Sequence, residues 1–168
     1  MSLDSRLGRI LTGTPARQRE AVAVSRLLLR TATLLERRVD EALMPFAVHM
    51  REYLALHLLS DSVHEPLRPS DLSVALDATR TQVTRLLDAL EHKGLLVRAQ
   101  DAQDRRSLQL ALTAAGAHLL ARCAPVVRQV YLKTWTSVDE QATRLLREQL
   151  GSVYSGLLAA GAEGRSAP

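Results

Sequence analysis

Aromatic residues, cysteine and long apolar runs are all scarce in this sequence. Phe, Trp and Tyr together make up 3% of the residues although 46% are hydrophobic, so leucine, alanine and valine must fill the core. Such a composition favours helices over a sheet-rich fold. The single cysteine, Cys123, excludes an internal disulfide. The apolar runs are too short to cross a bilayer and no secretory signal is recognisable, so we expect a soluble cytoplasmic protein with no membrane partner.

The sequence motifs of several enzyme classes are absent as well. There is no Gly-rich phosphate loop, no Gly-x-Ser-x-Gly motif and no cluster of histidine with cysteine. The five histidines include no pair spaced four residues apart, which is the spacing that places two zinc ligands on one helix face. Cys123 lies among apolar residues and predicts a buried, unreactive thiol. We therefore expect no enzyme activity, no cofactor and no metal site.

The first half of the chain carries helical patterns. Between Arg17 and Leu43 apolar residues return at steps of three, four and seven, which predicts a long amphipathic helix. Pro45 interrupts the pattern, and a second helix is predicted from about Phe46 to Ser60. A third, short helix is predicted over residues 70–76, with Pro69 at its start.

The segment after Ala78 has the strongest helix signal in the chain. Thr79 and Gln82 form a Thr-x-x-Gln capping box, and Gly94 is a typical helix stop. At 100° per residue one stripe of this helix is apolar and the opposite stripe is polar. The apolar stripe holds Val83, Leu86, Leu87 and Leu90, and the polar stripe holds Thr81, Arg85, Asp88 and His92.

Two short strands are predicted next, over residues 95–100 and 107–112, because apolar and polar residues alternate in the second of them. The polar segment between them predicts a hairpin tip. A long helix is predicted from Thr113, and a last helix is predicted to start at a capping box of Ser137 and Glu140 and to run to about Ala160. The order of helix, tight turn, capped helix and hairpin is that of a winged helix-turn-helix, so we predict a mainly helical fold with a small β-wing.

The exposed first turn of the capped helix has the chemistry needed to read a DNA major groove. An arginine can bond a guanine edge through two donors, a glutamine can pair with adenine, and a threonine methyl can contact thymine. The chain has a formal net charge of +4, but residues 68–106 contain nearly as many acidic as basic side chains. The prediction of DNA binding therefore depends on where the arginines point rather than on bulk charge.

Arginines at the hairpin tip suit a minor groove, where negative potential is concentrated. Asp104 would accept hydrogen bonds from a neighbouring arginine and so orient the tip. The predicted DNA-binding residues are Ser70, Thr79, Arg80, Thr81, Gln82, Thr84, Arg85, Arg105, Arg106 and Ser107.

These motifs together resemble the MarR family of bacterial transcription regulators. Asp104, Arg106, Leu112 and Thr113 match the family pattern Asp-x-Arg, five residues, Leu-Thr, and Gly116 follows. PSDL (69–72) and VTRLLDALEHKGLL (83–96) resemble the corresponding family segments. The resemblance covers about residues 20–158, and within the family it is strongest to the EmrR/MprA branch of multidrug-efflux repressors.

The resemblance implies a homodimer that binds a palindromic operator in double-stranded DNA and is released by a small lipophilic or phenolic effector. It also implies a minor-groove contact for Arg106. The implied organisation is a flexible arm (1–16), dimerisation helices (17–43 and 113–160), a winged helix-turn-helix (46–112) and a disordered tail (161–168).

Three alternatives remain open from the sequence. The chain could instead regulate catabolism of aromatic compounds, or it could activate rather than repress. In a different class of function, it could be a winged-helix protein-interaction module that does not bind DNA. The effector-binding residues are unknown, with His57 as the single candidate.

Overall fold

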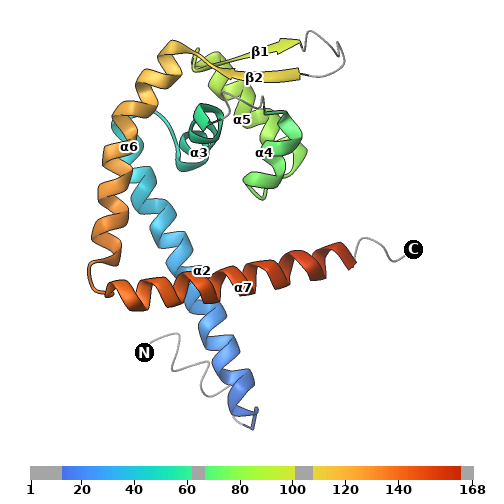
Figure 1. Cartoon of the computed structure of the whole chain (residues 1–168), viewed down its shortest axis with the longest axis vertical. Coiled ribbons are helices and arrows are strands. Elements are labelled where there is room, and N and C mark those ends of the chain that lie inside the picture. The colour runs from blue at the N-terminus through green and yellow to red at the C-terminus, as the bar shows by residue number, and fades with distance from the viewer. Residues whose placement is uncertain (1–12, 62–66, 101–107, 164–168) are drawn as a thin grey trace. The chain divides into compact units, whose positions relative to one another are not determined.

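A computed structural model describes residues 13–61, 67–100 and 108–163 of the chain (Figure 1). Helices dominate, as predicted, and two strands form one small antiparallel sheet. The elements are α2 (Ala16–Leu43), the 3-10 helix η1 (Met44–Phe46), α3 (Met50–Asp61), α4 (Pro69–Ala75), α5 (Arg80–His92), β1 (Leu96–Gln100), β2 (Leu108–Leu112), α6 (Ala114–Trp135) and α7 (Glu140–Glu163). None of the described helices is both long enough and apolar enough to cross a membrane.

The chain turns sharply between α2 and α3. Pro45 lies in η1, and Ala47 follows with a left-handed φ of 55°. The second helix therefore begins at Met50, four residues later than the sequence predicts. A local cap then supports this start, because the backbone N–H of His49 donates to Glu52 Oε2 over 2.9 Å and so satisfies a donor at the beginning of the helix.

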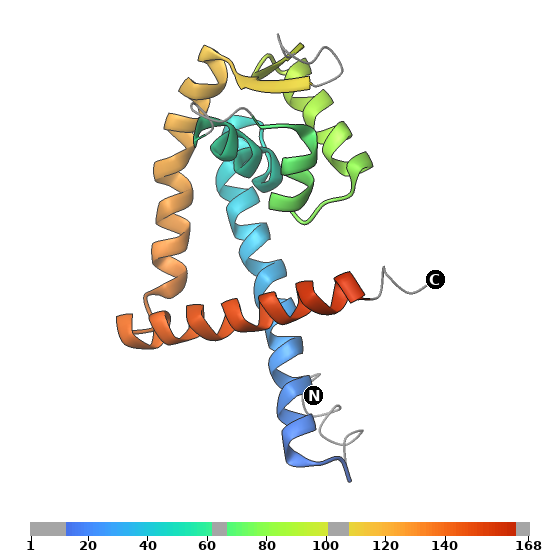
Figure 2. The same ribbon diagram turned by 45° about the vertical axis from the view of Figure 1, so that its right-hand side comes forward.

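The short helix α4 packs on α5, and a tight turn joins them (Figure 2). At the start of α4 the carboxylate of Asp71 accepts a hydrogen bond from the backbone N–H of Arg68 over 2.7 Å. Asp71 thus satisfies the N–H of the residue before the helix, whereas the side chain of Arg68, which has no acceptor atom, cannot accept from the first turn of α4. In the turn, Asp77 has a φ of 46°, a region where aspartate is enriched among residues other than glycine.

The two strands pair with Leu96 opposite Leu112 and Arg98 opposite Leu110. Leu96 and Leu110 are buried, whereas Val97 is exposed on the other face, so the hairpin has one face toward the core. Figure 1 shows α3, α4 and α5 beneath this hairpin. The backbone N–H of Leu110 also donates to the carbonyl of Leu67 over 3.2 Å, which ties the segment before α4 to β2.

The core lies where α3, α4, α5, the hairpin and α6 meet the end of α2. Its fully buried large side chains are Leu43, Leu56, Leu72, Leu87, Leu90, Leu96, Val39, Val83, Val127 and Cys123. Leu86, predicted to be on the buried stripe of α5, is only half-buried.

Gly116 allows α6 to start against the end of the α5–β1 turn. A Cβ atom on Gly116 would lie 2.1 Å from the carbonyl oxygen of Leu95. Thr113 caps the same helix, because its Oγ1 accepts from the N–H of Gly116 over 3.0 Å and donates to the carbonyl of Gly94 over 2.8 Å. Only glycine fits this approach of two backbones.

The chain divides into two compact units, residues 1–127 and 128–168. In the second unit α7 begins at Glu140, and its cap is Asp139 rather than the predicted Ser137, since Asp139 Oδ1 accepts from the N–H of Ala142 over 2.8 Å. The helix ends at Glu163 and so includes the first three residues of the predicted disordered tail. Residues 1–12 of the predicted arm and 164–168 of that tail lie outside the described residues.

Candidate nucleic-acid interface

The start of α5 has the predicted reciprocal cap. The N–H of Gln82 donates to Thr79 Oγ1 over 3.3 Å, and the N–H of Thr79 donates to Gln82 Oε1 over 2.8 Å. The Thr79 hydroxyl also donates to Gln82 Oε1 over 3.0 Å. Two of these bonds use the oxygen of the Gln82 side chain, so its NH₂ group is the part available to a ligand. Pairing with adenine through both atoms would require Gln82 to leave the cap.

The first two turns of α5 carry the predicted row of exposed polar side chains. Arg80, Thr81, Gln82, Thr84 and Arg85 are all exposed. The apolar residues Val83, Leu87 and Leu90 are buried behind them. The Thr84 hydroxyl donates back to the carbonyl of Arg80 over 2.9 Å, so that contact occupies its proton.

Ser70 is exposed in the first turn of α4, and its hydroxyl donates to Asp71 Oδ1 over 3.3 Å. The tip of the wing lies outside the described residues, and with it Asp104, Arg105, Arg106 and Ser107. The minor-groove contact of Arg106 and the orienting role of Asp104 therefore stay predictions.

Arg98 on β1 connects the wing to α5. Its Nη2 bonds Asp88 Oδ1, and its Nε lies 3.4 Å from Glu91 Oε2. Arg98 opposes Leu110 in the sheet and so faces the core side of the hairpin, toward the helix. The sequence places Asp88 on the polar stripe of α5, but this carboxylate serves the wing strand. Pairing with Arg98 also offsets negative charge close to the candidate DNA-reading surface.

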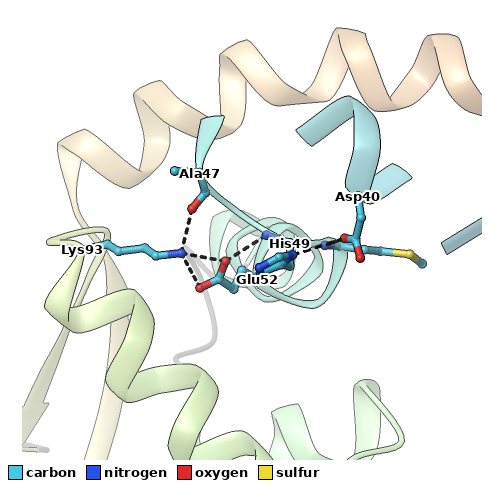
Figure 3. A network of polar contacts seen from close by, with 6 residues as sticks. Asp40, Ala47, His49, Glu52 and Lys93 are labelled. Carbon is cyan, nitrogen blue, oxygen red and sulfur yellow. Dashed lines mark hydrogen bonds and ion pairs between the residues drawn. The ribbon is translucent and has the colours of Figure 1, made fainter. Parts of the chain in front are cut away.

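A second polar contact fixes the other side of α5. Lys93, which follows the last turn of the helix, donates to Glu52 on α3 and to the carbonyl of Ala47 (Figure 3). The sequence analysis missed Arg98, Glu52 and Lys93. Residues 52 and 93 lie 41 positions apart, and no periodicity relates positions so distant.

The other candidate residues play structural parts or stand apart from this surface. Cys123 is buried, and its burial raises the pKa of the thiol, an effect that the nearby Arg122 only partly opposes. His57 is exposed on α3, with its Nδ1 3.8 Å from Asp61 Oδ2 and its ring edge-on to Tyr53. In the part of the chain that the structure describes, no three His, Cys, Asp or Glu side chains are grouped so that they could hold a metal ion.

Several hollows among the described residues lie away from α5, and two of them bear on an effector. One of about 490 Å³ lies at the junction of α2 and α3 and is lined by Arg37, Asp40, Glu41, Met44, Ala47, Val48 and His49. The other, of about 570 Å³, lies within the second unit, where Tyr131 and Trp135 of α6 and Arg144 of α7 are among the lining residues. Neither includes His57.

A helix, a tight turn, a second helix capped and exposed at its amino end, and a two-stranded hairpin define a winged helix-turn-helix protein. The family model named "MarR family" matches residues 48–108, which span α3 to the start of β2. The chain belongs to the MarR family and is a transcription regulator rather than an enzyme.

Individual relatives agree with this assignment. The transcriptional repressor MprA of Escherichia coli K12 is 28% identical over 138 residues, which cover 78% of each chain. The HTH-type transcriptional repressor MT2955 of Mycobacterium tuberculosis is 30% identical over 129 residues, which cover 75% of this chain and 91% of that protein.

Solved structures share the fold. The structure of Staphylococcus aureus MepR in complex with DNA has a TM-score of 0.73 at 24% identity, covering 79% of this chain and 95% of MepR. CouR of Rhodococcus jostii, solved with p-coumaroyl-CoA bound, has a TM-score of 0.69 at 25% identity, covering 77% of this chain and 90% of CouR.

Proposed function

We propose that this regulator binds a palindromic operator as a homodimer, reads each half-site with the first two turns of α5, and is released by a small effector. The observation that carries the proposal is the row of exposed side chains on the capped end of α5, with Val83, Leu87 and Leu90 buried behind it. A helix that enters a major groove uses these first turns to reach base edges.

The chemistry of this row suits the major groove. Arg80 and Arg85 can each offer paired donors to guanine, and Thr81 has a methyl group that suits thymine. The positive end of the helix dipole favours a neighbouring phosphate. The capping residue Thr79 lies at this end of α5, and Ser70 is exposed in the first turn of α4. Arg105, Arg106 and Ser107 at the wing tip would add the minor-groove contact, with Asp104 orienting them.

The apolar faces of the long helices support the homodimer. Along one stripe of α2 the exposed fraction rises from 0% at Val39 to 38% at Leu28 and 61% at Val24. The stripe continues toward the amino end after the core has ended, so a second chain is the natural cover. On α7, Leu146, Val153 and Leu157 recur at steps of seven and four and are all exposed.

A homodimer would present two α5 helices about 34 Å apart, which is one turn of DNA. An effector relieves binding only if it prefers one spacing of these helices over another. The hollow of about 490 Å³ where α2 meets α3 supports this idea, because it lies at the junction of a proposed dimerisation helix with the winged segment. Its lining residues Met44 and Val48 would contact a lipophilic compound.

The controlled genes follow from resemblance alone. Similarity to the multidrug-efflux branch supports an efflux operon, with a lipophilic or phenolic compound as inducer. The shared fold of CouR, which was solved with p-coumaroyl-CoA, keeps regulation of aromatic catabolism as a second candidate.

The test is selection of bound duplexes from a random pool by the purified chain, followed by titration of the selected duplex at several salt concentrations. We expect a palindromic site and an affinity that falls steeply with salt. Arg85→Ala should cost about 1–3 kcal/mol of binding free energy and relax the preference at one base position. Arg30→Ala, an exposed change on α2, is the matched control.

The same titration separates the DNA reader from a protein-interaction module. A module of that kind would select no consensus, and Arg85→Ala would leave its weak DNA binding unchanged. A panel of phenols and lipophilic cations then tests release: at least one class should lower affinity for the selected duplex. If none does, the effector part of the proposal is wrong while DNA reading stands.

A further inference from the structure

The carboxyl end of α5 is held by an ion pair that reaches two other elements. Lys93 Nζ donates to both carboxylate oxygens of Glu52, over 2.7 and 2.8 Å, and to the carbonyl oxygen of Ala47 over 2.8 Å (Figure 3). These three acceptors satisfy all three protons of the ammonium group. Lys93 thus joins the end of α5 both to α3 and to the bend that follows α2.

Glu52 is the only buried charged side chain among the described residues, with 5% of its surface exposed. Its Oε2 also accepts from the N–H of His49, so the carboxylate is fixed by its own helix and by Lys93. A buried carboxylate is tolerated only when it is paired and hydrogen-bonded. The pair is therefore unlike the exposed ion pairs of the surface, such as Arg144 with Glu140, in which water can replace either partner.

The network continues into α2. Asp40 Oδ1 accepts from the N–H of Met50 over 2.6 Å, and His49 Nδ1 lies 3.9 Å from the same oxygen (Figure 3). A line of polar contacts thus runs from Asp40 on α2, through the first turn of α3, to Lys93 after α5.

The two ends of α5 differ in how they are held. At the carboxyl end, Gly94 has a left-handed φ of 69°, the N–H of Leu95 donates to the carbonyl of Leu90 over 2.9 Å, and Arg98 holds the side of the helix. The amino end projects exposed side chains. A helix of 13 residues is roughly 20 Å long, so a tilt of about 10° at the held end would displace the first turn by roughly 3 Å. A displacement of that size breaks hydrogen bonds to base edges.

We propose that Glu52 and Lys93 are positioning residues for DNA recognition: they set the angle of α5 against α2 and α3, so that base contacts at its first turn align. The proposal rests on the proposed function, in which α5 reads the operator. It assigns to Lys93 no contact with DNA.

The experiment compares full-length variants on two duplexes, the one that the unchanged chain selects from a random pool and a scrambled duplex of the same length and composition. Lys93→Met and Glu52→Gln break the pair from either side, and Lys93→Arg keeps the charge and the donors. Lys133→Met makes the same chemical change at an exposed position on α6 and serves as the control. Thermal unfolding defines a temperature at which all variants are folded.

We expect Lys93→Met and Glu52→Gln each to lower affinity for the selected duplex about tenfold, a loss comparable with that of one mismatched base pair. Affinity for the scrambled duplex should match that of Lys133→Met, and Lys93→Arg should restore most of the loss. The double variant Glu52→Gln with Lys93→Met should bind no worse than either single variant, because both remove one contact.

Three results would overturn the proposal. Equal loss on both duplexes, with a salt slope reduced by about one, would make Lys93 a phosphate contact. A lower unfolding temperature with an unchanged ratio of the two affinities would make the pair purely structural. If Lys93→Arg failed to restore selectivity, the ion pair would not be the cause. Arg85→Ala is measured alongside to test the proposed function itself. If α5 does not read the operator, Arg85→Ala stays as selective as the unchanged chain. If α5 does read it and only the Glu52–Lys93 proposal is wrong, Arg85→Ala loses selectivity.

Discussion

The winged segment and the long helices differ in how far their apolar side chains are buried. Between Val39 and Val127 leucine and valine side chains from α2, α3, α4, α5, the wing strands and α6 bury one another. On α7, by contrast, none of the side chains from Glu140 to Ala160 is buried. A helix gains most of its stability from packing of its apolar face, which is why the proposed dimer contact was assigned to α7 and the amino half of α2. The winged segment thus buries its leucines and valines within one unit, whereas the apolar stripes of α7 and of the amino half of α2 stay exposed.

The largest effect should come from charging the exposed apolar stripe of α7. In the double variant Val153→Glu with Leu157→Glu, four carboxylate oxygens would face the proposed partner chain. Desolvating them is costly, so we expect monomers and a loss of at least about 100-fold in operator affinity, because one half-site is lost. Sedimentation and DNA titration measure both effects. Ser155→Glu, on the opposite face of the helix, should change neither.

A dimer that survived the double variant would show that α7 is not its interface. The exposed apolar stripe of α7 would then need another explanation than contact with a second chain.

The next largest effect should come from two glycine variants, which we expect to change stability in opposite directions in the two regions. Gly116→Ala places its Cβ against the carbonyl of Leu95 inside the winged unit, where the neighbour is backbone and cannot turn aside. We expect a loss of about 3 kcal/mol in the free energy of unfolding. Gly151→Ala, in open space on α7, should instead stabilise its helix by about 0.5–1 kcal/mol. Denaturant unfolding checks both, and equal effects would contradict the comparison.

Helix caps should give a smaller effect. Thr79→Ala removes the oxygen that accepts from the N–H of Gln82, and we expect a loss of about 1 kcal/mol in stability. It also frees the Gln82 side chain from the hydroxyl of residue 79, so any base preference due to Gln82 should change. Asp139→Ala removes the cap of α7 at the same expected cost but should leave base preference unaltered. Calorimetry and duplex selection give the two readouts.

The smallest effect concerns Cys123. Because burial raises the pKa of this thiol above its ordinary value of 9.0, the folded chain favours the neutral form. We expect labelling by iodoacetamide at neutral pH to be much slower than for a free thiol and to accelerate on unfolding. The neutral buried thiol therefore makes its full contribution to folding stability below the ordinary thiol pKa. That contribution is lost as the pH rises from the ordinary pKa through the raised pKa of the folded chain. Rapid labelling of the folded chain would contradict burial, and Cys123→Ser provides the blank.

Local signals predicted most of the elements. The capping box of Thr79, the stop at Gly94 and the apolar stripe of α5 act within one or two helical turns, so the sequence contains everything needed to recognise them. The start of α3 was predicted four residues too early because Phe46 continues the apolar pattern, whereas Pro45 and the left-handed Ala47 prevent a helix there.

The polar contacts that orient α5 could not be predicted in the same way. In the sequence Asp88 resembles any other surface carboxylate, and only the structure shows that β1 places Arg98 beside it. Glu52 lies at a helix position where an acidic residue is ordinary, and its need for Lys93 arises from burial. Burial and charge pairing depend on which elements meet, and those elements are far apart in the chain.

The sequence by itself determined the order of helices and strands, the buried and exposed stripes of α5 and the membership of the MarR family, because periodicity, capping and motif spacing are short-range properties. Only the tertiary structure decided which charges pair across elements and which apolar faces remain uncovered. The physical reason is that desolvation of a side chain is set by all its neighbours in space, and residues far apart in the sequence become neighbours only when the chain folds.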